Sequence, residues 1–196
     1  MISSLVLLRH GKTALSGRYA GATDVDLDAE GIEQVCSLRR AIAKERFDSV
    51  LCSPLRRCRQ TARLLELDAG ITLKDDLREI DFGLWESLDI DEIEKTDPDN
   101  LKRWIEDPAR FCFPEGECRQ AFIDRIEHFS QSLQGMQGGK VLIISHAGVI
   151  RHLICSLLGL SSEHYLLFKI QEARFTTLDC FSAGGVLTGL NREELG

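Results

Sequence analysis

The sequence has no long apolar run, and this excludes a protein that crosses the membrane as an α-helix. Such a helix needs about 20 consecutive apolar residues, and no segment of the 196 residues reaches that length. The apolar run near the start, Leu5 to Leu8, is also far too short for the core of a secretory signal. We therefore expect a cytoplasmic protein without a membrane partner.

Basic residues are scarce relative to acidic residues, at 24 against 31, which gives a net charge of -7. A surface that binds nucleic acid needs a basic stripe, so we expect no nucleic-acid partner. The imbalance does not exclude an anionic small-molecule substrate, because a cleft can concentrate positive charge inside an acidic protein. The oligomeric state is left open by these features.

The seven cysteines do not stand in the pattern of a metal site. The sequence has no C-x-x-C pair and no pair of histidines with zinc spacing, so we expect neither a metal nor a cofactor. Cys112 and Cys118 are separated by five residues, as are Cys52 and Cys58. We expect reduced thiols at all of these positions, as in most cytosolic proteins.

Short apolar segments alternate with amphipathic segments along the chain. We expect strands at residues 2–8, 48–52, 71–73, 140–145, 168–170, 174–181 and 186–190, the last two joined as a hairpin. We expect helices at residues 29–44, 53–66, 117–133 and 147–158. Ser53 would be the N-cap of the second helix, with Pro54 at its first position.

This alternation predicts an α/β fold, a three-layer α/β/α sandwich around a mostly parallel sheet with an antiparallel edge strand. We expect one domain over residues 1–196. The acidic stretch 89–106 is broken by Asp97-Pro98, which predicts two short helices and a helical insertion or lid near 89–117.

Chemically active residues follow three of the predicted strands. Arg9 and His10 end the first strand, Arg57 lies in the helix after the second, and His146 follows the strand at 140–145. Ligands in such folds bind at the carboxyl ends of the strands, so these side chains should face one crevice. Two arginines and two histidines there would form a cationic pocket of the size of a phosphate group.

The chemistry of phosphate transfer needs these residue types. Arginine forks match phosphate oxygens and stay charged, and the N–H groups at the start of the helix near Ala147 suit an anion. A neutral imidazole such as His10 can attack phosphorus, provided that its other nitrogen is held as a donor, for example to a carbonyl. Glu79 is our candidate to protonate the departing oxygen.

The chain resembles the histidine phosphatase superfamily, also called the phosphoglycerate mutase-like family. The matching stretches are LRHG at 8–11, YAGATD at 19–24, SPLRR at 53–57, EIDFG at 79–83, PEGE at 114–117 and SHAGV at 145–149. They follow the order of the family over most of the chain. The resemblance implies that His10 is phosphorylated, that Arg9, Arg57 and His146 bind the phosphoryl group, and that Glu79 donates the proton.

Two weaker assignments and three departures also come from this resemblance. Ser16 stands where many members have an Asn that contacts phosphate, and Thr23 falls in the substrate loop. Lys12 stands where Glu is common, Ser87 replaces a Gly, and Cys118 replaces a Ser. The stretches at 19–24 and 79–83 are most similar to α-ribazole phosphatases of cobalamin nucleotide-loop assembly.

The sequence thus predicts a metal-independent phosphomonoesterase that forms a phosphohistidine, with α-ribazole 5′-phosphate as a candidate substrate. A phosphoglycerate mutase and a phosphatase for sugar phosphates, fructose 2,6-bisphosphate or phosphoproteins are the alternatives. A non-enzymatic phosphate-binding module would lack a nucleophile or an acid, and a cysteine phosphatase would need an Arg six residues after a Cys; neither pattern fits. We interpret His128, His152 and His164 as surface or packing residues.

Overall fold

A computed structural model describes residues 2–136 and 138–195. A single sheet runs through it in the order β3-β2-β4-β1-β5-β6. Its strands are β1 (Ser4–Arg9), β2 (Ser49–Cys52), β3 (Ile71–Leu73), β4 (Lys140–Ser145), β5 (Phe175–Phe181) and β6 (Gly184–Arg192). Strands β1 to β4 are parallel, whereas β5 pairs antiparallel with β1 and then with β6. The predicted α/β class is confirmed, and the predicted hairpin of the last two strands forms the antiparallel edge of the sheet.

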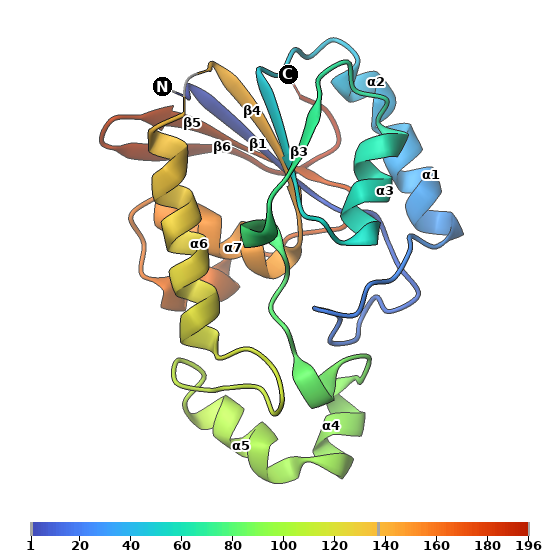
Figure 1. Cartoon of the computed structure of the whole chain (residues 1–196), viewed down its shortest axis with the longest axis vertical. Helices are drawn as coiled ribbons and strands as arrows, with labels where there is room; N and C mark the ends of the chain where they lie inside the picture. The colour runs from blue at the N-terminus through green and yellow to red at the C-terminus, as the bar shows by residue number, and fades with distance from the viewer. Residues whose placement is uncertain (1, 137, 196) are drawn as a thin grey trace.

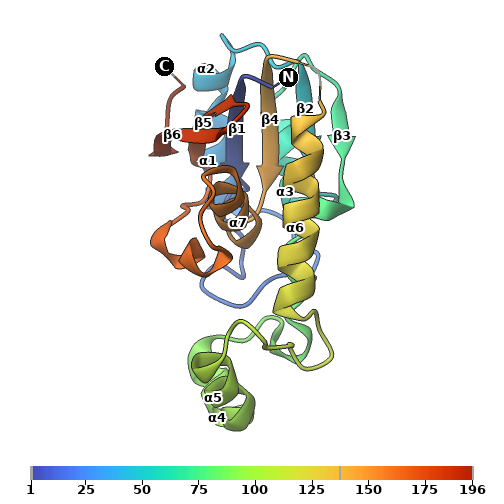
Figure 2. The same ribbon diagram turned by 90° about the vertical axis from the view of Figure 1, so that its left-hand side faces the viewer.

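Helices cover both faces of this sheet (Figure 1 and Figure 2). Helices α1 (Ala29–Ser37), α2 (Arg39–Ile42) and α3 (Arg56–Leu64) lie on one face, and α6 (Arg119–Gln134) and α7 (Ala147–Leu157) lie on the other. Successive strand side chains point to opposite faces. Val6 and Leu8 therefore pack on the side of α1 and α3, whereas Leu5 and Leu7 pack on the side of α6 and α7.

The acidic stretch forms two short helices, α4 (Ile90–Thr96) and α5 (Pro98–Glu106). Asp89 and Glu92 form a capping box at the start of α4, in which each side chain accepts a backbone N–H of the other at 2.9 Å. Helices α4 and α5 project beyond the carboxyl ends of the parallel strands, at the bottom of Figure 1. Movement of this segment as a lid stays a prediction. Within the described ranges, no helix is long and apolar enough to cross a membrane.

Two predicted elements differ from the structure. The helix expected at 29–44 is interrupted at Leu38, and Ile32, expected on its buried face, is 43% exposed. Residues 168–170 are not a strand. The carbonyl oxygens of Phe168 and Ile170 instead accept hydrogen bonds from arginine side chains, at 2.8 Å in each case.

Helix α3 begins at Arg56, later than the Ser53-Pro54 start that the sequence favours. The Ser53 hydroxyl lies 2.8 Å from Nε2 of His146, and it accepts the N–H of Leu55, the residue before α3, only at 3.4 Å. The N–H of Arg56 is bound instead by the Asp24 carboxylate, at 2.6 Å. A distant residue thus replaces the local cap.

Cys112 and Cys118 form a disulfide, so the prediction of reduced thiols was wrong for this pair. The two residues face each other in an isolated antiparallel bridge. The turn at 114–117 reverses the chain between them, a contact that five intervening residues do not reveal in the sequence. Cys36, Cys52, Cys58, Cys155 and Cys180 are free thiols.

Candidate active site

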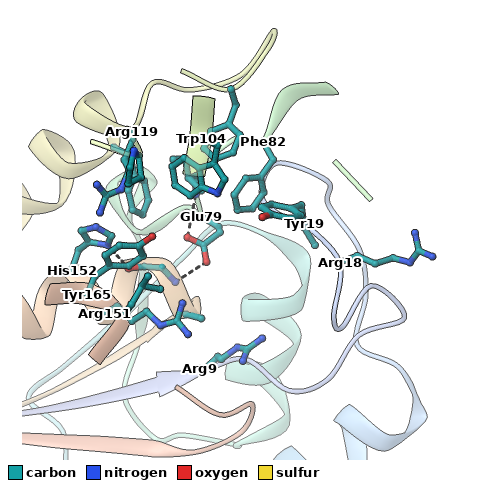
Figure 3. Close-up of a pocket in the computed structure, with 18 of the residues that line it drawn as sticks. Arg9, Arg18, Tyr19, Glu79, Phe82, Trp104, Arg119, Arg151, His152 and Tyr165 are labelled. Carbon is teal, nitrogen blue, oxygen red and sulfur yellow. Dashed lines mark hydrogen bonds between the residues drawn. The ribbon is translucent and has the colours of Figure 1, made fainter. Parts of the chain in front are cut away.

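A cavity of about 810 Å³ opens at the carboxyl ends of the parallel strands (Figure 3). Six of the eight predicted site residues line it: Arg9, His10, Ser16, Arg57, Glu79 and Ala147. His146 and Thr23 are not part of the lining. The strand-end argument therefore brings most of the expected side chains to one place.

His10 follows β1 directly and is 7% exposed. Its Nδ1 lies 2.8 Å from the carbonyl oxygen of Gly11, so Nδ1 is the N–H donor and the expected carbonyl partner is present. Burial first, and then the charges of Arg9 and Arg57, hold the pKa of His10 well below its ordinary value. The ring is therefore neutral, with its lone pair on Nε2.

Arg9 is shared between the cavity and a carboxylate that sequence reasoning missed. Its Nη1 donates to the Ile170 carbonyl at 2.8 Å, and its Nη2 donates to Glu172 Oε1 at 3.1 Å. The same oxygen accepts the Ser16 hydroxyl at 2.6 Å. Burial lowers the pKa of Arg9 and the charge of Glu172 opposes this change. A phosphate that enters must compete with Glu172 for this guanidinium.

Arg57 is 1% exposed and is held mostly by protein acceptors. Its Nε donates to His146 Nδ1 at 3.1 Å, and its Nη1 donates to the Thr23 carbonyl at 2.8 Å. Its Nη2 donates to the carbonyls of Gly21 at 2.8 Å and Ala20 at 3.3 Å. A guanidinium has five N–H donors, so one on Nη1 is left for a ligand.

His146 lies behind His10, with ring centroids 5.1 Å apart. Because Nδ1 accepts from Arg57, the proton is on Nε2, which donates to Ser53 Oγ at 2.8 Å. Burial, followed by the charge of Arg57, holds the pKa of His146 well below its ordinary value. Both ring nitrogens thus have protein partners. The sequence led us to expect that His146 faces the cavity, but it is not among the residues that line it.

Glu79 sits at the start of α7. Its Oε2 accepts the N–H of Gly148 at 2.9 Å, and its Oε1 accepts that of Ile80 at 3.2 Å. A Cβ at position 148 would come within 2.3 Å of Glu79 Oε1, so this placement of the carboxylate depends on glycine.

Thr23 lies in the loop at 19–24, and its side chain is bound by Glu86. The Thr23 hydroxyl and N–H both donate to Glu86, which also accepts the N–H groups of Gly21 and Ala22. Glu86 therefore fixes the loop at 19–24 and is not part of the cavity lining. The Thr23 side chain is used in this loop rather than at the pocket surface.

Three other residues of the cavity wall were missed or misread from the sequence. Arg119 begins α6, His152 lies on α7, and Tyr165 lies in the short 3-10 helix Ser162–Leu167. Arg119 is 3% and His152 is 5% exposed, so of the two roles expected for His152 the structure shows packing, against Phe122 and Tyr165, and not a surface position. The sequence did contain a signal that His152 faces the cavity. It lies one helical turn after Gly148, and residues four apart share a helix face.

Aromatic side chains form the part of the wall nearest α4 and α5. The Tyr19 and Phe82 rings meet edge to face at 4.9 Å, and Phe113 lies 5.0 Å from Phe82. Trp104, from α5, packs 5.3 Å from Phe113. Burial raises the pKa of the Tyr19 hydroxyl. The cavity thus combines a cationic floor with an apolar wall, as sites for small organic ligands do.

Comparisons with known proteins agree with this geometry. The profile of the histidine phosphatase superfamily (branch 1) matches residues 5–193. The adenosylcobalamin/alpha-ribazole phosphatase of Escherichia coli (strain K12) is 33% identical over 197 residues, which cover 98% of this chain and 97% of the relative. Phosphoserine phosphatase 1 of Hydrogenobacter thermophilus is 28% identical, over 95% of this chain and 91% of that protein.

A solved structure is similar over the whole fold. The crystal structure of a putative alpha-ribazole-5'-P phosphatase from Escherichia coli K-12 superposes with a TM-score of 0.94 at 32% identity, covering 100% of this chain and 99% of that one. Sequence and fold therefore point to the same set of relatives.

Proposed function

The chain belongs to the histidine phosphatase superfamily, and from this premise we propose that His10 carries a phosphoryl group from a phosphate ester to water. Because the chain is similar to phosphatases over nearly its whole length, the protein is a phosphoric monoester hydrolase that acts on small phosphate esters. The observation that best supports the role of His10 is its neutral ring, with Nδ1–H fixed on the Gly11 carbonyl and the lone pair on Nε2.

In the first half of the reaction, His10 Nε2 attacks phosphorus and the bond from phosphorus to the ester oxygen breaks. Glu79, in its protonated form, gives its proton to the departing oxygen, so the leaving group departs as an alcohol. Arg9 and the remaining N–H of Arg57 bind the phosphoryl oxygens. The product is a phosphohistidine, whose Nδ1–H stays on the carbonyl of Gly11.

In the second half, a water molecule attacks phosphorus and Glu79 takes its proton. The bond from phosphorus to Nε2 breaks, inorganic phosphate leaves, and the neutral ring of His10 is restored. Each group returns to its starting protonation state. The scheme uses no metal ion or cofactor.

The other predicted residues position the reacting groups or bind the phosphate oxygens. His146 holds the Nε of Arg57 and so positions the guanidinium, rather than binding phosphate itself. Ser16 turns its hydroxyl from Glu172 to a phosphate oxygen, and the N–H at Ala147 faces the anion from the start of α7. Thr23 acts only through its backbone carbonyl, which accepts a hydrogen bond from Arg57 and so holds the loop at 19–24 against that guanidinium.

The preferred substrate in this proposal is α-ribazole 5′-phosphate, which carries an aromatic base and a ribose. The cavity of about 810 Å³ is far larger than a phosphate group needs, and its aromatic wall suits a flat base. The similarity to the Escherichia coli phosphatase supports the same substrate. A cytoplasmic location and the absence of a nucleic-acid partner stay predictions from the sequence.

The alternatives are smaller or more highly charged esters. The similarity to a phosphoserine phosphatase favours a carboxylate-bearing ester. A sugar-phosphate or fructose 2,6-bisphosphate phosphatase, or a phosphoglycerate mutase, is also compatible with the family. A mutase would pass the phosphoryl group to a second substrate hydroxyl, so it would release little inorganic phosphate.

The first experiment measures phosphate release in excess EDTA from α-ribazole 5′-phosphate, phosphoserine, sugar phosphates, fructose 2,6-bisphosphate, 3-phosphoglycerate and phenyl phosphate. We expect the highest kcat/KM with α-ribazole 5′-phosphate. A clear preference for another ester would overturn the substrate assignment and keep the mechanism. Activity that returns only after metal is added would overturn the metal-independent mechanism.

A second experiment tests the nucleophile directly. Rapid quenching during turnover of phenyl phosphate, followed by mass spectrometry under alkaline conditions, should find a phosphate group on the peptide that contains His10. His10→Ala should abolish this adduct and turnover, whereas His128→Ala, at an exposed position on α6, should keep both. Substantial turnover by folded His10→Ala would show that another group is the nucleophile.

A further inference from the structure

Arg119 is buried, and no described residue forms an ion pair with its charge. It is 3% exposed, its Cζ lies 4.4 Å from the centroid of the Tyr165 ring, and its buried Nη2 has no hydrogen-bond partner among the described residues. None of the ion pairs in the described part of the chain includes Arg119. An uncompensated buried charge costs several kcal/mol, and the N-terminal end of α6 is unfavourable for a cation. The stacking on Tyr165 offsets only part of this.

His152 presents the complementary group beside the same ring. Its Nδ1 donates to the carbonyl of Gly148 at 2.8 Å, and its ring stacks on Tyr165 at 4.8 Å. Burial lowers the pKa of His152 to about 4, so the ring is neutral near pH 7. Nε2 therefore carries a lone pair, and it is buried with no partner in the described part of the chain. Two residues that line the cavity thus carry polar atoms with no partner among the described residues, a donor on Arg119 and an acceptor on His152.

These two groups lie on the leaving-group side of the reaction. Gly148 binds the Glu79 carboxylate through its N–H and His152 through its carbonyl, so the proposed acid and the acceptor share one residue. Figure 3 shows Arg119, His152 and Tyr165 together on one side of Glu79, with Tyr19 and Phe82 on the other. All of these residues line the same cavity.

We propose that Arg119, His152 and Tyr165 form a subsite for the hydroxyl groups of a sugar ring in the leaving group, an inference that rests on the proposed function. A hydroxyl oxygen accepts from Arg119 Nη2, while its proton, or that of a neighbouring hydroxyl, is donated to His152 Nε2. A carboxylate would accept a hydrogen bond from Arg119. It has no proton to donate to His152 Nε2, so its lone pairs would face the lone pair of that nitrogen. The subsite therefore selects sugar phosphate esters over carboxylate-bearing esters.

The test removes hydroxyls from the substrate before it changes the protein. Adenosine 5′-phosphate is compared with its 2′-deoxy, 3′-deoxy and 2′,3′-dideoxy forms, and each kcat/KM is divided by that for phenyl phosphate, which has no sugar. Unpaired buried groups cost about 1–3 kcal/mol, which corresponds to a factor of about 5 to 150, so loss of the bound hydroxyl should lower the ratio at least about 5-fold. A ratio that is the same for all four nucleotides overturns the subsite.

Variants then assign the effect to the two residues. In Arg119→Met, which keeps much of the apolar stem, and in His152→Phe, which keeps the stacking on Tyr165, the penalty for removing hydroxyls should shrink to within about twofold. Arg110→Met, at an exposed position in the turn between α5 and α6, is the matched control and should keep the full penalty. If a variant does not fold, the substrate series on the unchanged protein decides the question alone.

The outcomes separate this inference from the proposed function. Turnover of phenyl phosphate with a phosphohistidine, but without any dependence on hydroxyls, overturns the subsite alone. A preference for phosphoserine that Arg119→Met removes would show that the subsite binds a carboxylate, and overturns it too. If no ester is hydrolysed, the proposed function fails, and calorimetric binding of adenosine 5′-phosphate against its dideoxy form still tests the subsite.

Discussion

The neutral state of His152 makes stability depend on pH in a way that can be calculated. Burial lowers its pKa to about 4 from an ordinary value of 6.5. Between these two values the unfolded chain binds a proton that the folded protein does not, so the free energy of unfolding decreases as the pH falls through this window. At about 1.4 kcal/mol for each pH unit, acidification from pH 6.5 to 4 costs the folded state about 3 kcal/mol at this ring alone.

Urea unfolding of the unchanged protein and of His152→Asn, from pH 7.5 to pH 4, measures this effect. The Asn amide keeps a donor for the Gly148 carbonyl and does not titrate. The variant should gain about 3 kcal/mol relative to the unchanged protein as the pH falls, since only the latter carries the penalty. His128→Asn, at an exposed position, should show no such gain. A difference between the two proteins that is constant with pH would refute a neutral buried His152.

Three further substitutions test the site and its supports. Gly148→Ala should displace the Glu79 carboxylate and lower kcat for alkyl phosphates by about 100-fold or more, with little effect on aryl phosphates; an equal loss for both classes would contradict a role as proton donor. Glu172→Gln should tighten inhibition by inorganic phosphate about 10-fold, because one charge that opposes the anion is removed; an unchanged inhibition constant would show that Glu172 does not compete. Ser53→Ala should remove the acceptor of a buried imidazole N–H and lower the free energy of unfolding by about 1–3 kcal/mol, whereas unchanged urea unfolding would place that N–H in another hydrogen bond.

Local signals in the sequence failed where a distant residue supplied the partner. Ser53-Pro54 has the composition of a helix start, yet the hydroxyl of Ser53 is bound by His146, 93 positions away in the chain. Asp24 then caps α3 across the fold. Propensity describes what a segment does alone, and a buried hydrogen bond outweighs it. The same reasoning applies to Cys112 and Cys118, which meet only because a turn reverses the chain between them.

By itself the sequence determined the layers of the fold and the floor of the site. Apolar strands followed by amphipathic helices can bury their faces only in a covered parallel sheet, and the carboxyl ends of such strands meet at one edge. Arg9, His10, Arg57 and Glu79 therefore reach one cavity, as expected.

Only the tertiary structure decided what surrounds these groups and what state they are in. Glu172 pairs with Arg9 from a segment with no periodic pattern, and Arg119 and His152 face the cavity from different helices. Burial and long-range contacts set the charge of an imidazole and leave one guanidinium nitrogen of Arg119 with no partner among the described residues, and both depend on atoms far away in the chain. Residue spacing specifies which side chains can share an element, whereas packing between elements specifies what each one can bind.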